Sequence, residues 1–251
     1  MSAMAIGWIV FALVFGSALL AMYVHSLLPA EHLSSDSKDV VKLGIALVAT
    51  MSALVLSLLV ASAKSAFDTR SNQLTQVSAD IVLLDRALAR YGPETKEARS
   101  VLQHTVAATI DRFWPAEGAH PIVLDPATAP VEALYDKIEA LTPQNDAQRS
   151  MQSQAMTLAA DVARMRLLLF EQLGASIPVP FLVVLVFWHC IIFASFGLFA
   201  PRNATVIAAL CVSALSVAGA IFLILELDRS FEGLLQVSGQ PLRAALAQLG
   251  R

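Results

Sequence analysis

Three carboxylates and an arginine stand together at the end of the last apolar stretch: Glu226, Asp228, Arg229 and Glu232. Burying a carboxylate at a membrane boundary is costly, so such groups are usually paired or placed in a wet cavity. Glu226 and Arg229 are three apart and can pair on a helix, whereas Asp228 and Glu232 repel each other unless a cation or basic partner lies between them. Two readings remain open. The group forms a vestibule that concentrates ions or couples the tail to the rest of the chain, or it only marks the interface.

A single histidine, His189, lies in the middle of another apolar stretch, between Trp188 and Cys190. An ionisable side chain at membrane depth is a candidate for proton or ligand binding. The alternative is packing, because a neutral imidazole can hydrogen-bond a neighbouring helix at little cost.

Hydroxyl and cationic residues follow one line of the second apolar stretch: Thr50, Ser57 and Lys64 recur at intervals of seven. Seven residues make about two helical turns, so the three share a face. They are candidates for lining a water-filled path. The alternative is close helix packing, which small residues such as the neighbouring alanines favour.

Composition excludes several classes of protein. Of the 251 residues, 57% are hydrophobic and 15% charged, against about 25% charged in soluble domains. The net charge of −3 gives no reason to expect nucleic acid as a partner. The two cysteines, Cys190 and Cys211, show no metal-ligand spacing, and no catalytic motif is present. We therefore expect no enzyme, no catalytic residues, no metal and no cofactor.

Four stretches lack Asp, Glu, Lys and Arg altogether: residues 1–30, 43–63, 172–201 and 203–225. Each is long enough for a helix that crosses a bilayer, which needs roughly 20 apolar residues. The sequence predicts an all-α integral membrane protein with spans at about 4–28, 41–63, 177–200 and 205–225. The first stretch has no basic residue before it and is too long for a signal peptide, so we expect a retained span.

The region between spans two and three is predicted to be a four-helix bundle inserted at residues 65–175. Leu74, Val77, Ile81, Leu84 and Leu88 form one apolar stripe, and span two has no Pro or Gly between Gly44 and Tyr91 to stop it continuing into the insert. Further helices are expected at 94–114, 131–141 and 144–173, with inward positions on the first of them at Val101, Thr105, Ala108 and Phe113. A proline-rich loop is expected at 115–130.

The predicted organisation is spans one and two at 1–64, the insert at 65–175, the hairpin of spans three and four at 176–228, and a tail at 229–251. The tail contains a short amphipathic helix begun by Pro241, with Leu242, Ala245, Leu246 and Leu249 on its apolar side. Four spans put both termini and the insert on one side. Only Lys38, Lys42 and Arg202 among the 17 basic residues lie on the other, which favours a cytoplasmic insert.

The most specific residues lie in the last third of the chain. They read Phe181-Leu-Val-Val-Leu-Val-Phe-Trp188, Phe193-Ala-Ser-Phe-Gly-Leu-Phe-Ala-Pro-Arg-Asn203, Leu223-Ile-Leu-Glu-Leu-Asp-Arg229 and Phe231-Glu-Gly-Leu234. This string resembles the bestrophin-like domain family of bacterial membrane proteins, and the resemblance covers most of the chain. It implies kinship with bestrophins, which are pentameric, calcium-activated anion channels with four spans per subunit and a large cytosolic helical part.

The chain departs from bestrophins in two respects. Span two has no aromatic neck, its only aromatic residue being Phe67 at the very end. The acids after span four are interleaved with Arg229 and do not form an evident calcium clasp. No pore or calcium residue is therefore transferred from the resemblance.

Two hypotheses follow. The first is a homo-oligomeric ion channel of the bacterial inner membrane, with anions favoured over cations, span two lining the pore, and Glu226, Asp228, Arg229 and Glu232 at the cytosolic entrance. The second is a membrane-anchored scaffold or sensor whose bundle binds a protein partner. Expected partners are the lipid bilayer, further copies of the chain and small inorganic ions. Alternating-access transport would need inverted repeats, which are not evident.

Overall fold

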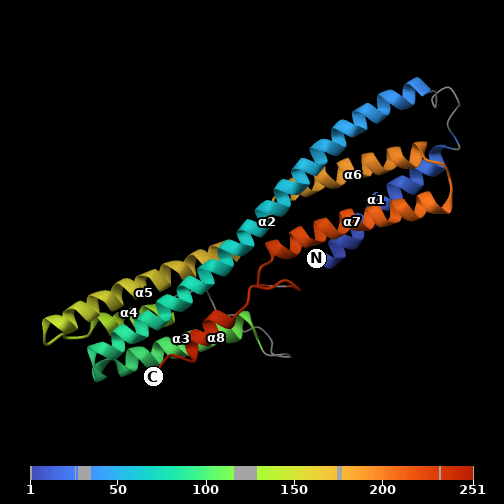
Figure 1. The fold of residues 1–251 in the computed structure, drawn as a ribbon. Helices are drawn as coiled ribbons and strands as arrows, with labels where there is room; N and C mark the ends of the chain where they lie inside the picture. Colours follow the sequence, from blue (N-terminus) through green and yellow to red (C-terminus); the bar gives the residue numbers. More distant parts are fainter. Residues whose placement is uncertain are drawn as a thin grey trace. The chain divides into compact units, whose positions relative to one another are not determined.

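The computed structural model describes residues 2–25, 27, 35–115, 129–173, 177–231 and 233–250. Its elements are α1 (Ala3–His25), α2 (Ser35–Tyr91), η2 (Pro93–Thr95), α3 (Lys96–Phe113), α4 (Ala129–Glu139), α5 (Asp146–Leu173), α6 (Val179–Phe199), α7 (Ala204–Asp228) and α8 (Gln240–Leu246). Helices and turns account for these ranges and no strand occurs in them, so the predicted all-α class is confirmed (Figure 1).

Four helices are long and apolar enough to cross a membrane: α1, the first part of α2, α6 and α7. They coincide with the four predicted spans, although α7 continues to Asp228, beyond the predicted end at Leu225. The predicted continuation of span two is also confirmed, because α2 is a single helix of 57 residues.

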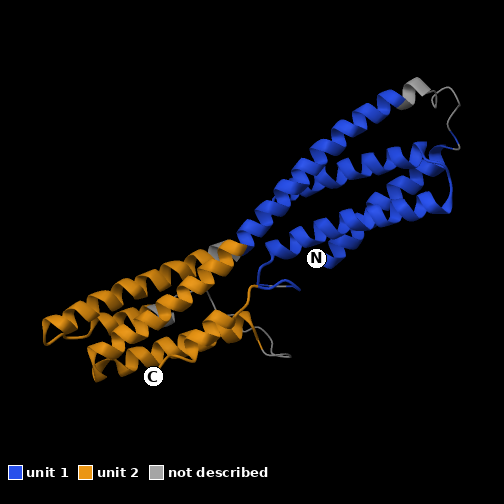
Figure 2. Cartoon of the chain, in the orientation of Figure 1, with its two compact units in different colours: residues 1–67, 176–236 blue, residues 68–175, 237–251 orange. Residues whose placement is uncertain are grey.

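The chain divides into two compact units, which Figure 2 distinguishes by colour. Residues 1–67 and 176–236 form what we call the apolar unit, and residues 68–175 and 237–251 form the bundle unit. The division falls within α2, after Phe67. It also splits the segment after span four, whose first residues belong to the apolar unit and whose last fifteen belong to the bundle unit.

In the apolar unit, α1 packs against both α6 and α7. The buried side of α1 repeats every three or four residues and consists mostly of small side chains: Ala3, Gly7, Val10, Val14, Ala18 and Met22. Small residues let helices approach closely where lipid provides no hydrophobic driving force. At one crossing only glycine fits, because a β-carbon on Gly197 of α6 would collide with the carbonyl oxygen of Ala18.

The turn between α6 and α7 also fixes the end of α1. Arg202 donates a hydrogen bond to the carbonyl oxygen of Met22, in the last turn of α1, where carbonyl groups lack partners within the helix. Asn203 is the N-cap of α7 and accepts a hydrogen bond from the Val206 N–H at 2.8 Å. The turn at residues 201–204 thus caps both helices.

The core of the bundle unit contains the predicted stripe of α2. Leu74, Val77, Ile81, Leu84 and Leu88 are all buried. The predicted inner face of α3 is wrong. Ala98, Leu102, Val106 and Ile110 are the buried residues, whereas Ala108 is exposed and Val101, Thr105 and Phe113 are only partly covered. On α5 the buried residues are Ala155 and Ala159.

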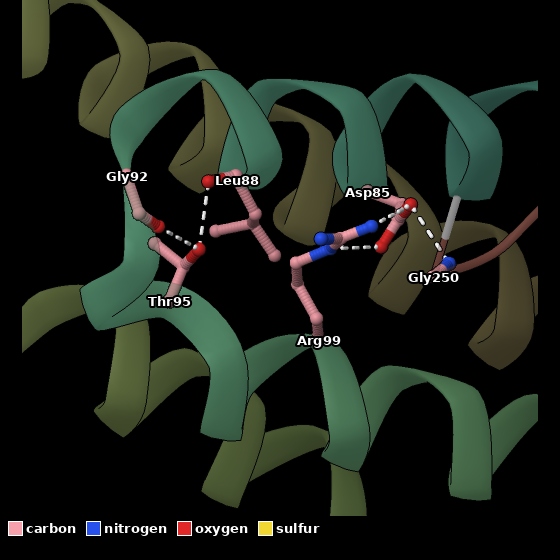
Figure 3. A network of polar contacts seen from close by, with 6 residues as sticks. All are labelled: Asp85, Leu88, Gly92, Thr95, Arg99 and Gly250. Atoms are coloured by element: carbon pink, nitrogen blue, oxygen red, sulfur yellow. Dashed lines mark hydrogen bonds and ion pairs between the residues drawn. The ribbon is translucent and has the colours of Figure 1, made fainter.

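A tight turn joins α2 to α3 (Figure 3). Gly92 has a φ of 141°, a conformation that favours glycine. The hydroxyl of the buried Thr95 reaches back to the carbonyl oxygens of Leu88 at 2.7 Å and Gly92 at 2.8 Å. The carbonyl of Leu88, in the last turn of α2, is satisfied in this way, and the chain reverses direction.

A bidentate ion pair between Asp85 and Arg99 links α2 to α3 close to this turn (Figure 3). Arg99 Nε and Nη2 donate to the two carboxylate oxygens of Asp85 at 2.7 and 2.9 Å. This hydrogen bonding raises the pKa of the Arg99 guanidinium. The Asp85 side chain is nearly buried, and it also accepts from the backbone N–H of Gly250 at 3.3 Å. The same carboxylate therefore holds the end of the tail.

The tail packs on α3 through α8, within the bundle unit. Leu242, Ala245 and Leu249 are buried, so the predicted apolar side of the tail helix is confirmed at these positions. Trp114 Nε1 donates to the Val237 carbonyl oxygen at 2.9 Å, and Gly239 lies against the Trp114 ring, where a β-carbon would come within 2.7 Å. A side chain at position 239 would displace this contact.

Candidate functional site

The membrane half of α2 presents three different faces along its length. One side packs into the apolar core through residues such as Val48, Val55 and Leu59. A second side exposes large residues, with Leu47, Leu54 and Leu58 between 64% and 68% exposed. The third side carries the predicted polar line described next. Of the 18 most apolar consecutive residues of α2, only 11% are buried, against 28% in each of the other three spans.

All three predicted pore-lining residues are exposed on this third side: Thr50, Ser57 and Lys64. The Thr50 hydroxyl donates to the Ala46 carbonyl oxygen at 2.8 Å, so it is satisfied within its own helix. The Lys64 ammonium lies 6.0 Å from the centre of the Phe67 ring. The three side chains are not brought together. They lie about 10 Å apart along the axis and form a line rather than a cluster.

His189 contacts α2 across the apolar unit. Its Nδ1 lies 2.8 Å from the Leu185 carbonyl oxygen and 3.2 Å from Ser52 Oγ, and both Ser52 and His189 are buried. A carbonyl oxygen only accepts, so Nδ1 carries a proton and donates it there. In the neutral ring the lone pair is then on Nε2. Packing against a neighbouring helix was one of the two interpretations of His189. The structure shows such a contact, with Ser52 of α2.

Glu226 is buried and binds the backbone beyond the end of α7. Its Oε2 accepts from the N–H of Leu234 at 2.7 Å and of Leu235 at 3.4 Å. Gly233 has a φ of 92°, and a β-carbon there would collide with the Glu226 carboxylate. Only a glycine lets the chain pass so close to the carboxylate. Two N–H donors stabilise the negative charge of a group that would otherwise be costly to bury.

The sequence offered Arg229 as the partner of Glu226, and this is wrong. Arg229 is the exposed C-cap of α7, and no ion pair joins it to Glu226 within the described residues. Asp228 accepts a hydrogen bond from the Ile177 N–H at 3.2 Å, which ties the end of α7 to the segment before α6. Glu232 lies outside the described residues, so the predicted repulsion between it and Asp228 stays a prediction.

The two described acids therefore act as backbone anchors at one end of the apolar unit. Arg229 is the exposed charge beside them. In the part of the chain that the structure describes, no group of three or more His, Cys, Asp or Glu side chains could hold a metal ion. The arrangement can order the loop after α7 and present a positive charge to solvent or to lipid headgroups.

Two partners in this region were missed by sequence reasoning. Ser52 was recognised only as one of many small residues of span two, and its link to His189 joins positions 137 apart. Gly233 carried a weak signal, since glycine seven residues after a buried acid permits the close approach that the carboxylate requires. The pairing itself depends on the path of the loop.

The family of the chain follows from comparison with known proteins. The family model named bestrophin-like domain matches residues 11–242, from the first span to the tail helix. The chain belongs to the bestrophin-like family. No curated protein matches it. The family agrees with the apolar helices in indicating a membrane protein related to bestrophin channels. The matched residues include every candidate site residue discussed above, from Thr50 to Glu232.

Proposed function

We propose that several copies of this chain assemble in the bacterial inner membrane into an ion channel, with anions favoured over cations. Membership of a family related to bestrophin channels supports the class of function. The observation that carries the proposal is the third side of α2. This side is exposed in the single chain and carries two hydroxyl groups and one cation, beside a second side that exposes Leu47, Leu54 and Leu58.

In the proposed assembly, α2 of each copy turns this side toward a central axis. Thr50 and Ser57 then offer polar atoms to a hydrated path, and Lys64 places a ring of positive charge at its end. A ring of like charges raises the local concentration of the opposite ion and excludes ions of its own sign. Lys64 therefore accounts for a preference for anions.

The proposed entrance lies at the end of α7, on the cytoplasmic side together with the bundle unit and both termini. Glu226 and Asp228 accept backbone N–H groups, which reduces their influence on a passing ion. Arg229 is exposed, so the charge presented at this entrance is positive. Glu232 is a further candidate for the same entrance. The proposal assigns no catalytic residue, metal, cofactor or nucleic acid to the chain.

The first test is the mass of the full-length protein in nanodiscs, measured by mass photometry or native mass spectrometry. The proposal requires a closed ring of at least about four copies, because one copy offers only one α2 to a pore. A monomer or dimer would contradict it.

The second test is ion flux into liposomes that contain the purified protein. Lys64→Glu should lower chloride over sodium permeability by about fivefold or more, since it reverses the charge nearest the proposed path. Lys96→Glu makes the same charge change on the bundle unit and should leave selectivity unaltered. Currents that Lys64→Glu does not alter would remove α2 as the pore helix.

The alternative function is a membrane-anchored scaffold or sensor. It is favoured by the bundle unit, which has its own buried core and is closed by the chain's own tail. A scaffold needs no ring of copies and conducts no ions, so the two tests above also separate the two functions.

A further inference from the structure

An apolar groove of about 340 Å³ lies between α1 and α7 in the apolar unit. On the α1 side it is lined by Gly7, Trp8 and Phe11. Ala218, Gly219 and Phe222 line it on the α7 side, and Leu234 of the following loop also lines it. The volume lies at the small end of the range for ligand sites and suits one flexible chain rather than a helix about 10 Å wide.

Three contacts shape the lining of the groove. Gly7 lies against Phe222, where an added β-carbon would come within 3.4 Å, so α1 and α7 meet closely there. The Trp8 and Phe11 rings meet edge to face, with their centres 5.9 Å apart. Leu234 is positioned by the hydrogen bond from its N–H to Glu226. The lining leaves open space at Gly219, because no atom lies within 4 Å of the place a β-carbon would occupy.

The end of the groove points to a charged ligand. Gly7 lies beside Phe222, so the first turns of α1 and the last turns of α7 are at the same end of the unit. Arg229 lies seven residues after Phe222, two turns further along the same side of α7, and it is exposed. Two carboxylates near it in sequence lie within the described residues and bind backbone groups: Glu226 accepts from the N–H groups of Leu234 and Leu235, and Asp228 accepts from that of Ile177.

We propose that this groove binds one acyl chain of an anionic phospholipid whose phosphate contacts Arg229. Phe222 lines the groove, and Arg229 lies about 10 Å further along the α7 axis. An apolar groove and a nearby arginine match the two parts of such a lipid, a hydrocarbon chain and an anionic headgroup. Trp8 belongs to the residue type that concentrates at the level of the headgroups. The site does not depend on ion conduction and would stand if the chain were a scaffold.

The test titrates the full-length protein in detergent with phosphatidylglycerol or with phosphatidylcholine of the same acyl chains, and counts bound lipids by native mass spectrometry. We expect one retained phosphatidylglycerol per copy and about fivefold weaker retention of phosphatidylcholine, the effect of one basic residue near an anionic headgroup. Arg229→Gln should remove this preference. Arg149→Gln, in the bundle unit, should not.

Filling the groove tests the acyl chain. Gly219→Leu places a side chain in the open floor and should weaken retention of both lipids by about tenfold or more, because a pocket rejects a ligand whose space is taken. Gly44→Leu is the matched control, since it also adds a leucine to a span at a glycine with nothing within 4 Å. A photoreactive acyl chain on phosphatidylglycerol should label peptides containing Phe11 and Phe222 in the unsubstituted protein, which avoids any effect of substitution on folding.

Three outcomes would overturn the proposal. The first is unchanged lipid retention in Gly219→Leu. The second is a drop in the number of copies per particle in that variant, which would make a second copy the occupant. The third is photolabelling spread evenly over all four spans, which would mean ordinary contact with bulk lipid.

Discussion

The two halves of α2 use the same residue types in opposite ways. In the membrane half, Leu43, Leu47, Leu54 and Leu58 are between 64% and 75% exposed. In the bundle half, Leu74, Leu84 and Leu88 are at most 4% exposed. One continuous helix therefore exposes these four leucines in one half and buries these three in the other. A bilayer around the first half would account for the difference, because exposed leucine costs nothing against hydrocarbon and is costly against water.

The interactions that hold the helices together also differ between the two units. Helices of the apolar unit approach closely through Ala18 and Gly197, and its buried carboxylate, Glu226, is satisfied by backbone N–H groups. The bundle unit packs large side chains and contains a bidentate ion pair between Asp85 and Arg99. The same kind of substitution should thus have very different effects in the two units.

The largest contrast is expected between Leu84→Ala and Leu54→Ala. Leu84 is completely buried, so its truncation should lower the free energy of unfolding of the bundle unit by about 3 kcal/mol. Leu54 is 68% exposed, and its truncation should cost less than about 0.5 kcal/mol. Hydrogen exchange measured by mass spectrometry should show faster exchange in bundle peptides for Leu84→Ala alone.

A large loss of stability from Leu54→Ala would contradict the contrast between exposed and buried leucines, which is seen in a single chain. It would show that this side of α2 is covered in the assembled protein, and a fall in particle mass in the same variant would identify another copy as the cover.

The next largest effect is expected at the ion pair of the bundle unit. Arg99→Met leaves the carboxylate of Asp85 nearly buried with only the Gly250 N–H as a described partner, and should cost about 2–3 kcal/mol. The double variant with Asp85→Asn should recover part of that loss, because no unpaired charge remains. If Arg99→Met and the double variant were equally destabilised, the loss would come from packing of the arginine stem.

The fold was largely predictable because its signals are local. Stretches without charge, the uninterrupted run from Gly44 to Tyr91 and the stripe from Leu74 to Leu88 each depend on neighbours within one helix. The inner face of α3 was misassigned: the buried residues Ala98, Leu102, Val106 and Ile110 recur every four residues on one side of the helix, and the predicted positions from Val101 to Phe113 lie on another side.

The site was less predictable because its contacts are distant in sequence or depend on loops. Glu226 has a nearby arginine that looks like a partner, yet a left-handed glycine brings Leu234 to it instead. Ser52 and His189 meet only because α2 and α6 pack together. Thr50, Ser57 and Lys64 were placed correctly on one face, since that follows from helical periodicity alone.

A smaller effect is expected at the polar contact inside the apolar unit. Ser52→Ala removes the hydroxyl beside His189 and should lower stability by about 0.6 kcal/mol, the usual value for a hydrogen bond between membrane helices. That corresponds to a fall in Tm of about 1–2 °C for a protein of this size. Ser57→Ala, on the exposed side, should leave Tm unchanged. A loss of ion flux in Ser52→Ala without a change in Tm would mean that the pair serves conduction rather than packing.

The smallest effect is expected at an exposed ion pair of the bundle unit. Lys137 Nζ lies 2.6 Å from Glu97 Oε2, and the hydrogen bond, followed by the charge of Lys137, lowers the pKa of the Glu97 carboxyl. A carboxyl whose pKa is lowered by folding contributes stability at neutral pH, and this contribution is lost as the pH falls through the lowered pKa. Glu97 is 82% exposed, so water and salt screen most of the interaction.

Lys137→Met should therefore melt slightly below the unsubstituted protein at neutral pH, and the two melting curves should converge as the pH falls below the ordinary glutamate range. High salt at neutral pH should produce the same convergence by screening the pair. Glu97→Gln is the matched control, because it should show no further difference on adding Lys137→Met. A gap between Lys137→Met and the unsubstituted protein that persists at low pH would mean that the lysine stem contributes more than its charge.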